Sequence, residues 1–187
     1  RSSMHKVTGA LTQSSVLHVH SSLVDMDRVT SALHIVQSTS PNYLLMTSLD
    51  CARYELAMHG REMMQQALAL ASYAREQINR IAGFACMGTE VVGQAGIAGL
   101  DTTRLVITAK KLGLTGFDLE ECLFQKYAVN MELADYENVL AIVTYANTRE
   151  EIDRLISACR SISQDLLSDT YVINRNWKKT HNQEIPC

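Results

Sequence analysis

Three chemically active side chains lie close together at the start of the sequence: the hydroxyl of Ser3, the imidazole of His5 and the amine of Lys6. A hydroxyl and an imidazole can bind a phosphate group, and a lysine amine can bond covalently to an aldehyde. Pyridoxal phosphate carries both an aldehyde and a phosphate. Although a lysine taken alone is usually a solvated surface residue, this cluster predicts a pyridoxal-phosphate site with Lys6 as its catalytic lysine.

Several further blocks follow this cluster in a fixed order, and together they are much more specific than one short motif. They are Leu-Thr-Gln-x-Ser-x-Leu-His at 11–18, Gln-Ser-Thr-Ser-Pro-Asn-Tyr-Leu-Leu-Met at 37–46, Ser-Leu-Asp-Cys-Ala-Arg at 48–53, Leu-Gly-Leu-Thr-Gly-Phe at 112–117, Glu-Leu-Ala-Asp at 132–135 and Val-Leu-Ala at 139–141. From Ser3 to about Ser163 the sequence resembles the bacterial ornithine/lysine/arginine decarboxylases. Members of that family are pyridoxal-phosphate enzymes with the aspartate-aminotransferase fold, fold type I.

The resemblance assigns roles to four residues. Lys6 aligns with the lysine that holds the cofactor, while His5 and Ser3 align with residues that contact its phosphate or steady its ring. Ser38 aligns with a position that reaches the phosphate in a partner subunit, which implies a homodimer or a larger homo-oligomer. The resemblance further implies decarboxylation of arginine, lysine or ornithine to an amine of the polyamine pathway.

Where the sequence begins and ends leads us to expect a fragment. It starts with Arg1, inside the cofactor-lysine motif, whereas half of the family's large domain precedes that lysine. The carboxylate that pairs with the pyridine nitrogen and the ring that stacks on the cofactor are therefore expected in a preceding part of the same polypeptide, and the chain alone is expected to be inactive.

The resemblance predicts an α/β fold that comprises the C-terminal half of the large cofactor domain, a long linking helix and a small α+β domain. We expect the first part to span residues 1–82 and a glycine-rich linker to span residues 83–102. The small domain is expected at 103–165, and a polar tail at 166–187 would lead to a further C-terminal domain. Taken alone, residues 103–163 would also pass for a non-catalytic ligand-binding or dimerisation module, which is our alternative hypothesis.

Local patterns predict the individual elements. A short strand is expected at 16–20, and helices are expected from Asp25 to Val36, from about 42 to a C-cap at Gly60, and from 61 to 81. Strands are expected at 104–108, 131–134 and 139–145, with a helix at 117–128 between the first two. Thr148 and Glu151 form a capping box for a last helix, which buries a stripe at 152, 155, 156 and 159.

Composition and charge argue against several other classes of protein. The formal net charge of −3 gives no electrostatic basis for binding nucleic acid or an anionic membrane, and no apolar run approaches the length of a membrane span. The five cysteines are scattered singly, and those at 51, 122 and 159 are expected to be buried. An odd, unpaired set of thiols is typical of a reducing cytoplasm, and it predicts no metal site.

Three other features have weaker claims to function. His18 and His20 could share a metal ion on one strand face, but no carboxylate or thiol is nearby, so a strand with polar contacts is the better interpretation. The Gly-x-x-Gly-x-x-Gly run at 93–99 lacks both the dinucleotide-binding spacing and the lysine of a phosphate loop. Arg104 is a candidate to bind a substrate carboxylate, although a surface arginine at a strand end is the more ordinary interpretation.

Overall fold

A computed structural model describes residues 2–20, 22–94 and 96–168, and these divide into two units, at 1–66 and from 67 onward. The first unit contains β1 (Ser2–Ser3), α1 (Met4–Val7), β2 (Ser15–Val16), α2 (Met26–Val36) and the first part of α3 (Tyr43–Asn79). Strands β1 and β2 pair in antiparallel fashion, so the start of the chain is joined to the segment that follows α1. The strand expected at 16–20 ends at Val16, and His18 and His20 are exposed beyond it.

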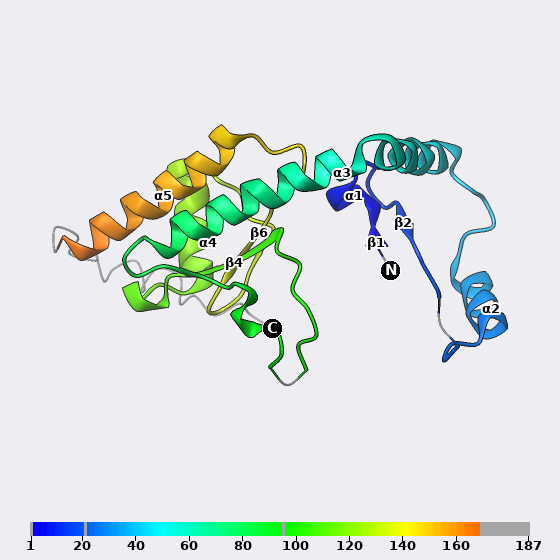
Figure 1. Cartoon of the computed structure of the whole chain (residues 1–187), viewed down its shortest axis with the longest axis horizontal. Coiled ribbons are helices and arrows are strands. Elements are labelled where there is room, and N and C mark those ends of the chain that lie inside the picture. The colour runs from blue at the N-terminus through cyan, green and yellow to red at the C-terminus, as the bar shows by residue number, and fades with distance from the viewer. Residues whose placement is uncertain (1, 21, 95, 169–187) are drawn as a thin grey trace, which may run out of the picture. The chain divides into compact units, whose positions relative to one another are not determined.

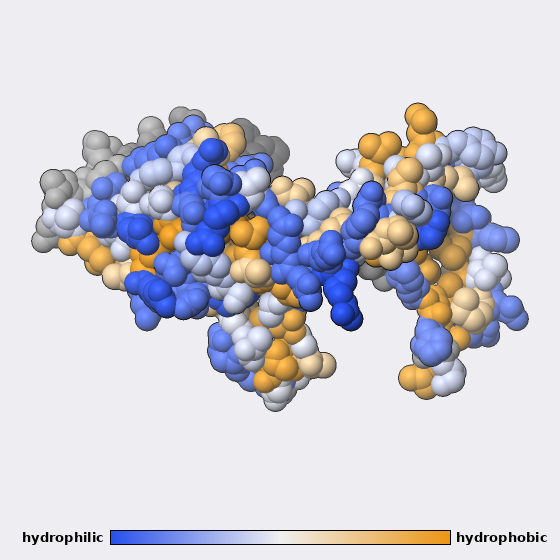
Figure 2. All heavy atoms as spheres, turned by 45° about the horizontal axis from the view of Figure 1, so that its top comes forward, coloured by the Kyte–Doolittle hydropathy of each residue, from blue (hydrophilic) through white to orange (hydrophobic). Residues whose placement is uncertain are grey.

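Helix α2 forms as the sequence predicted. The Asp25 side chain accepts hydrogen bonds from the amides of Asp27 and Arg28, which would otherwise have no partner at the helix start. None of the residues of α2 is buried, and Ile35 is 84% exposed. Figure 2 shows apolar side chains gathered on the surface of this unit.

The helix expected to end at Gly60 does not end there, and α3 runs without interruption from Tyr43 to Asn79. Gly60 keeps ordinary helical geometry instead of the left-handed conformation of a C-cap. A glycine inside a helix costs only about 1 kcal/mol relative to alanine, and the apolar spacing on both sides outweighs that cost. The prediction of two helices was wrong for this reason.

The second unit is built on a four-stranded antiparallel sheet with the order β3-β4-β6-β5. Its strands are β3 (Ala85–Cys86), β4 (Arg104–Thr108), β5 (Leu133–Ala134) and β6 (Val139–Ile142). β4 has the expected bounds, whereas β5 and β6 are shorter than expected. The strand–helix–strand–strand–helix succession that the sequence predicted is confirmed, with β3 added as an edge strand.

Three helices cover one face of this sheet: the second part of α3, α4 (Gly116–Tyr127) and α5 (Arg149–Leu167) (Figure 1). The alternate residues Leu105 and Ile107 of β4 are fully buried against them. The stripe predicted on α5 is buried as well, and Cys159 is fully enclosed. Since most of the buried apolar residues belong to this layer, the second unit has a core of its own.

Both helices that follow the sheet strands begin with a capping box. In α5 the Thr148 side chain accepts from the amide of Glu151, and the Glu151 carboxylate accepts from the amide of Thr148, as predicted. Thr115 and Asp118 make the same reciprocal pair at the start of α4. Each box satisfies two backbone donors at a helix start, so the sequence marks where both helices begin.

The glycine-rich span expected to be a linker contains β3 and a short 3-10 helix, η1 (Thr89–Val91). Arg75 of α3 fixes both ends of the segment between β3 and β4. Its guanidinium donates to the carbonyls of Met87 at 2.8 Å, Thr102 at 2.9 Å and Arg104 at 3.1 Å. The chain divides within α3, between 66 and 67, and not in this span, because β3 pairs with β4 as part of the sheet.

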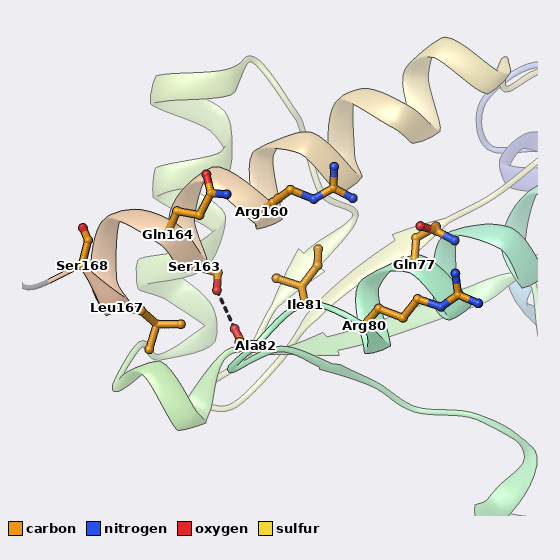
Figure 3. Close-up of a pocket in the computed structure, with 9 residues that line it drawn as sticks. All are labelled: Gln77, Arg80, Ile81, Ala82, Arg160, Ser163, Gln164, Leu167 and Ser168. Carbon is orange, nitrogen blue, oxygen red and sulfur yellow. Dashed lines mark hydrogen bonds between the residues drawn. The ribbon is translucent and has the colours of Figure 1, made fainter.

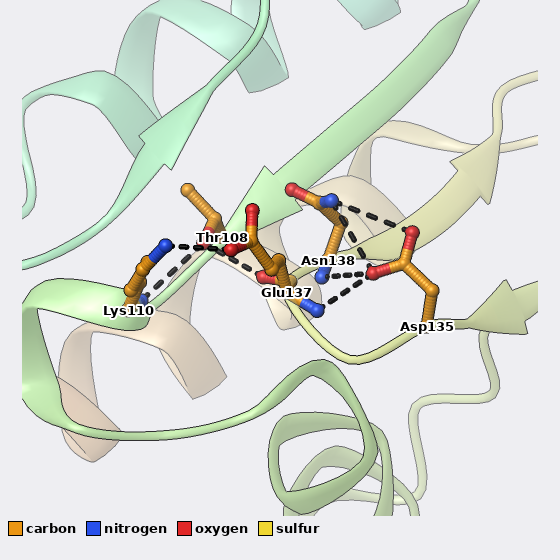
Figure 4. A network of polar contacts seen from close by, with 5 residues as sticks. All are labelled: Thr108, Lys110, Asp135, Glu137 and Asn138. Carbon is orange, nitrogen blue, oxygen red and sulfur yellow. Dashed lines mark hydrogen bonds and ion pairs between the residues drawn. The ribbon is translucent and has the colours of Figure 1, made fainter.

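A polar network ties the β5–β6 hairpin to β4 and to η2 (Lys110–Leu112) (Figure 4). Asp135 accepts from the amides of Glu137 and Asn138, and these hydrogen bonds lower the pKa of its carboxyl group. Thr108 donates to the carbonyl of Glu137, whose carboxylate pairs with Lys110 at 2.6 Å. The hydrogen bond and charge of Glu137 raise the pKa of Lys110, which keeps that amine protonated.

Candidate cofactor-lysine site

The three residues of the first cluster lie on or beside α1. Lys6 is exposed on the helix, whereas His5 and Ser3 are half-buried. Ser3 is the N-cap of α1, but its side chain makes no capping hydrogen bond. The structure thus brings an exposed amine, an imidazole and a hydroxyl together on one short element.

The imidazole of His5 is oriented by the chain that follows α1. Its Nδ1 lies 3.0 Å from the carbonyl oxygen of Ser14, and the amide of Met4 donates to the same oxygen at 3.1 Å. A carbonyl can only accept, so Nδ1 carries the hydrogen and the neutral ring has its acceptor at Nε2. The ring atom available to a ligand is therefore Nε2.

The structure does not join Ser38 to this cluster by any hydrogen bond among the described residues. Ser38 lies between α2 and α3 and is exposed. Its hydroxyl donates to the carbonyl of Ser40 at 3.4 Å and accepts from the amide of Ser40 at 3.1 Å. The cap of α3 is Asn42, whose side chain accepts from the amides of Leu44 and Leu45. Ser38 is therefore not needed to cap the helix.

Sequence reasoning missed two residues of this region, Ser14 and Ser48. Ser14 is only 3% exposed, and its hydroxyl lies 3.5 Å from that of Ser48 on α3. The backbone amide of Leu11 also donates to the Ser48 hydroxyl, at 3.2 Å. Both serines fall within blocks of the family resemblance, but nothing in their local pattern indicates a contact between residues so far apart in sequence.

The other candidate features do not form a second reactive site. Among residues 2–20, 22–94 and 96–168 there is no group of three potential metal ligands. Arg104 is less exposed than expected: its side chain is 27% exposed, and its Nε pairs with Asp101 at 3.3 Å. Its Nη1 is buried and has no partner within the described part of the chain.

An open groove of about 490 Å³ lies between the ends of α3 and α5 (Figure 3). Two arginines line it, and one of them, Arg80, is already paired with Glu76. The lining contains no histidine, lysine, cysteine or carboxylate that could act as a nucleophile or base. The groove therefore offers no chemistry that competes with the Lys6 cluster.

The described cysteines at 51, 86, 122 and 159 are free thiols. Burial raises the pKa of Cys86 to about 11 and that of Cys159 to about 12, so neither is a reactive thiolate near neutral pH. Cys51 was expected to be buried, but it lies on the exposed side of α3. No helix in the described part of the chain is long and apolar enough to cross a membrane.

Comparison with known proteins identifies the family. Residues 1–151 match the model of the Orn/Lys/Arg decarboxylase major domain. The chain is 42% identical over 164 residues to the arginine decarboxylase of Bacillus subtilis, and 42% identical over 161 residues to that of Halalkalibacterium halodurans. These alignments cover 88% and 86% of this chain but only 34% and 33% of the relatives. The chain belongs to the Orn/Lys/Arg decarboxylase family and spans about a third of the length of these relatives.

Solved structures share the fold. The lysine decarboxylase of Francisella novicida matches with a TM-score of 0.67 at 16% identity, over 94% of this chain and 30% of that protein. The constitutive lysine decarboxylase of Escherichia coli matches with a TM-score of 0.65 at 15% identity, over 94% of this chain and 31% of that protein. At this level of identity the likeness concerns the fold alone, and it supports the mixed helix-and-sheet class that the sequence predicted.

Proposed function

We propose that this chain is the part of a pyridoxal-phosphate-dependent decarboxylase that carries the cofactor lysine. The substrate in this proposal is a basic amino acid, arginine, lysine or ornithine, and the product is an amine of the polyamine pathway. The observation that carries the proposal is the placement of the exposed Lys6 amine beside His5 and Ser3 in a chain of the Orn/Lys/Arg decarboxylase family. A cytoplasmic location is part of the proposal, and the free thiols of the described residues support it.

The residues of α1 fit part of such a cofactor. Lys6 is an exposed residue and provides the amine that an aldehyde requires. The Ser3 hydroxyl is not used for capping, so it can donate to a phosphate. His5 has Nδ1 committed to a carbonyl, which leaves Nε2 as the ring atom that the cofactor can approach. When bound, pyridoxal phosphate supplies an electron-poor ring that stabilises the carbanion left by carbon dioxide.

In this proposal each side chain has a defined task. Lys6 would hold the cofactor through Nζ. His5 keeps its orientation through Nδ1 and presents Nε2 to the cofactor. The Ser3 hydroxyl would donate to the phosphate. The partner for the pyridine nitrogen is assigned to the part of the polypeptide that precedes the motif, as the family resemblance implies.

The non-catalytic alternative rests on the second unit alone. The described residues of the second unit, 67–94 and 96–168, form a core of their own and need no cofactor to account for their packing. The family match, however, includes the Lys6 segment and both units in one alignment. A free dimerisation module would not require that segment, so we favour the enzyme.

Borohydride reduction tests the assignment of the lysine. The full-length protein is loaded with pyridoxal phosphate, reduced, digested and mapped by mass spectrometry. We expect the cofactor label on Lys6 and no label on Lys110, whose amine is kept protonated by Glu137. Product analysis with arginine, lysine and ornithine then identifies the substrate.

Two variants complete this experiment. Lys6→Arg keeps the positive charge but cannot form the covalent bond, so it should lose the label and nearly all activity. Lys111→Arg changes a lysine next to Lys110, outside the site, and should retain both the label on Lys6 and the activity. Label on Lys110 or Lys111 of the unaltered protein would contradict the proposal.

A further inference from the structure

The buried residues of the first unit gather around the segment that follows α1. Among the described residues of 1–66 only Ala10, Ser14 and Ala52 are buried, at 7%, 3% and 5% exposure. Two of them belong to the segment 8–14 that follows α1, and Ala52 lies on α3 one helical turn beyond Ser48. This junction is therefore the best-packed place in the first unit.

The segment is folded into a defined turn. The amide of Ser14 donates to the carbonyl of Leu11 at 3.1 Å, and Gln13 has a φ of 76°. This arrangement fits a four-residue turn that requires a left-handed third residue, a conformation that is unfavourable for glutamine. A residue keeps such a conformation only when its surroundings fix it, so contacts outside the turn must hold it in place.

Ser48 makes those outside contacts. Its hydroxyl donates to the carbonyl of Leu45 in its own helix at 2.8 Å, which leaves its oxygen to accept from other donors. The amide of Leu11 donates to this oxygen. Because the Ser48 hydrogen is already used within α3, the Ser14 hydroxyl is the donor in the 3.5 Å contact between the two serines. One side chain on α3 thus binds both the first and the last residue of the turn.

The turn also holds α1 in place. The carbonyl of Ser14 accepts from the Met4 amide and from His5 Nδ1, and both residues lie on α1 directly before Lys6. A continuous chain of hydrogen bonds leads from Ser48 through Ser14 to His5. Displacement of Ser14 would release both bonds to α1.

We infer that Ser48 is a positioning residue for the Lys6 site, acting through Ser14 and His5 without touching the cofactor. This inference rests on the proposed function for its catalytic meaning, but the hydrogen-bonded chain itself does not depend on a cofactor. A hydroxyl at position 48 is required in this arrangement, because it must accept from two donors while its hydrogen is used within α3.

The test compares three variants of the full-length protein. Ser48→Ala removes the hydroxyl, Ser48→Thr keeps it, and Thr47→Ala removes an exposed hydroxyl from the preceding position of the same helix. The first readout is amide hydrogen exchange of residues 4–14 in the protein without cofactor. Ser48→Ala should speed exchange there by about tenfold, on the scale of one lost hydrogen bond, while Ser48→Thr and Thr47→Ala should leave it near the original rate.

The second readout is the ring of His5, observed by nitrogen NMR in protein with labelled histidine. In the original protein Nδ1 should carry the hydrogen of the neutral ring, and Ser48→Ala should shift the ring toward a mixture of both forms. A substitution that only weakened the fold would lower the unfolding temperature without changing this tautomer. Unchanged exchange and an unchanged tautomer in folded Ser48→Ala would overturn the inference.

The third readout is the cofactor, and it separates this inference from the proposed function. In protein loaded with pyridoxal phosphate, Ser48→Ala should lower kcat about tenfold with a smaller change in KM, and Ser48→Thr should restore it. If Lys6 takes no label even in the original protein while exchange responds as expected, the proposed function fails and the positioning contact stands. If Lys6 is labelled normally but none of the three readouts responds to Ser48→Ala, the function stands and the positioning role fails.

Discussion

At the scale of single residues, Gly116 is the described glycine at which a side chain would clash most closely with backbone atoms. A Cβ built there would lie 2.2 Å from the carbonyl oxygen of Asn138 and 2.3 Å from that of Asp135. The Gly116 amide also donates to the carbonyl of Tyr136 at 3.1 Å. The start of α4 therefore packs directly on the β5–β6 hairpin because residue 116 has no side chain.

We expect Gly116→Ala to lower the free energy of unfolding by about 2–3 kcal/mol, since backbone atoms on both sides must move to admit the methyl group. Denaturant unfolding of the purified chain measures the change. Gly99→Ala is the control, because nothing lies within 4 Å of a Cβ at that position. A loss of stability equal in the two variants would mean that the close contact at Gly116 is not what matters.

At the scale of elements, α3 continues through Gly60, a residue that usually weakens a helix. A Cβ at Gly60 would meet only Leu56, at 3.5 and 3.6 Å, which is ordinary van der Waals contact. The position is compatible with any helix-forming residue. Gly60 differs in backbone conformation from Gly113, which has a φ of 78° and ends η2 in the left-handed conformation.

Gly60→Ala should therefore stabilise the chain by about 0.5–1 kcal/mol, because alanine loses less backbone entropy than glycine in a helix. Gly113→Ala should have the opposite sign, since a side chain strains that backbone conformation. Thermal unfolding followed by circular dichroism compares the two. If Gly60→Ala is destabilising to the same extent as Gly113→Ala, the helix ends near residue 60 as the sequence alone predicted.

Elements that carry their own signals could be predicted from sequence, and the rest could not. The capping pair Thr148 and Glu151 marks the start of α5 by local chemistry, and Asp25 does so for α2. Gly60 was misread because a glycine after a helical pattern fits both a C-cap and an interior position, and only the packing of the whole helix decides. β3 was missed because two residues are too short for any periodicity, and their pairing with β4 is a tertiary contact.

The candidate site divides in the same way. Lys6, His5 and Ser3 lie within four residues of one another, so their grouping at α1 could be predicted from the motif. Ser48 could not be joined to them, because its contact with Leu11 spans 37 positions and depends on where α3 passes the turn. Sequence similarity marked the block that contains Ser48 without indicating what its hydroxyl does.

At the scale of the whole molecule, the first unit buries little and exposes much. Leu23, Ile35 and Val36 are 94%, 84% and 78% exposed, and Tyr43 and Leu44 at the start of α3 are 74% and 75% exposed. Apolar surface of this extent marks a region that packs against other protein. Such a surface is compatible with the expectation, drawn from the family resemblance, that Ser38 lies near a partner subunit.

A shared site makes a distinct prediction for mixed dimers. If Ser38 of one subunit contacts the phosphate of the cofactor bound at Lys6 of the other, a dimer of one Ser38→Ala and one Lys6→Ala subunit has one intact site and one doubly altered site. At limiting cofactor, such dimers should regain about half the activity per dimer, while Ser38→Ala homodimers retain cofactor more weakly by about 1–2 kcal/mol. Affinity tags on the two subunits isolate the mixed species for assay.

Ser31→Ala, an exposed serine on α2, serves as the matched control and should behave as the original subunit in every pairing. If isolated mixed dimers show no more activity than the Ser38→Ala subunit alone provides, Ser38 acts on its own chain and the shared site is wrong. The result does not depend on which basic amino acid is the substrate.

Arg75 fixes both ends of the segment between β3 and β4, and this bears on how the length of the segment can vary in evolution. Because the guanidinium bonds the carbonyls of Met87, Thr102 and Arg104, the base of the segment stays closed whatever its middle contains. The entropy of closing a loop grows only slowly with its length, so insertions and deletions between 92 and 99 should cost the sheet little. This segment is thus a place where related sequences can diverge in length while β3 and β4 keep their register.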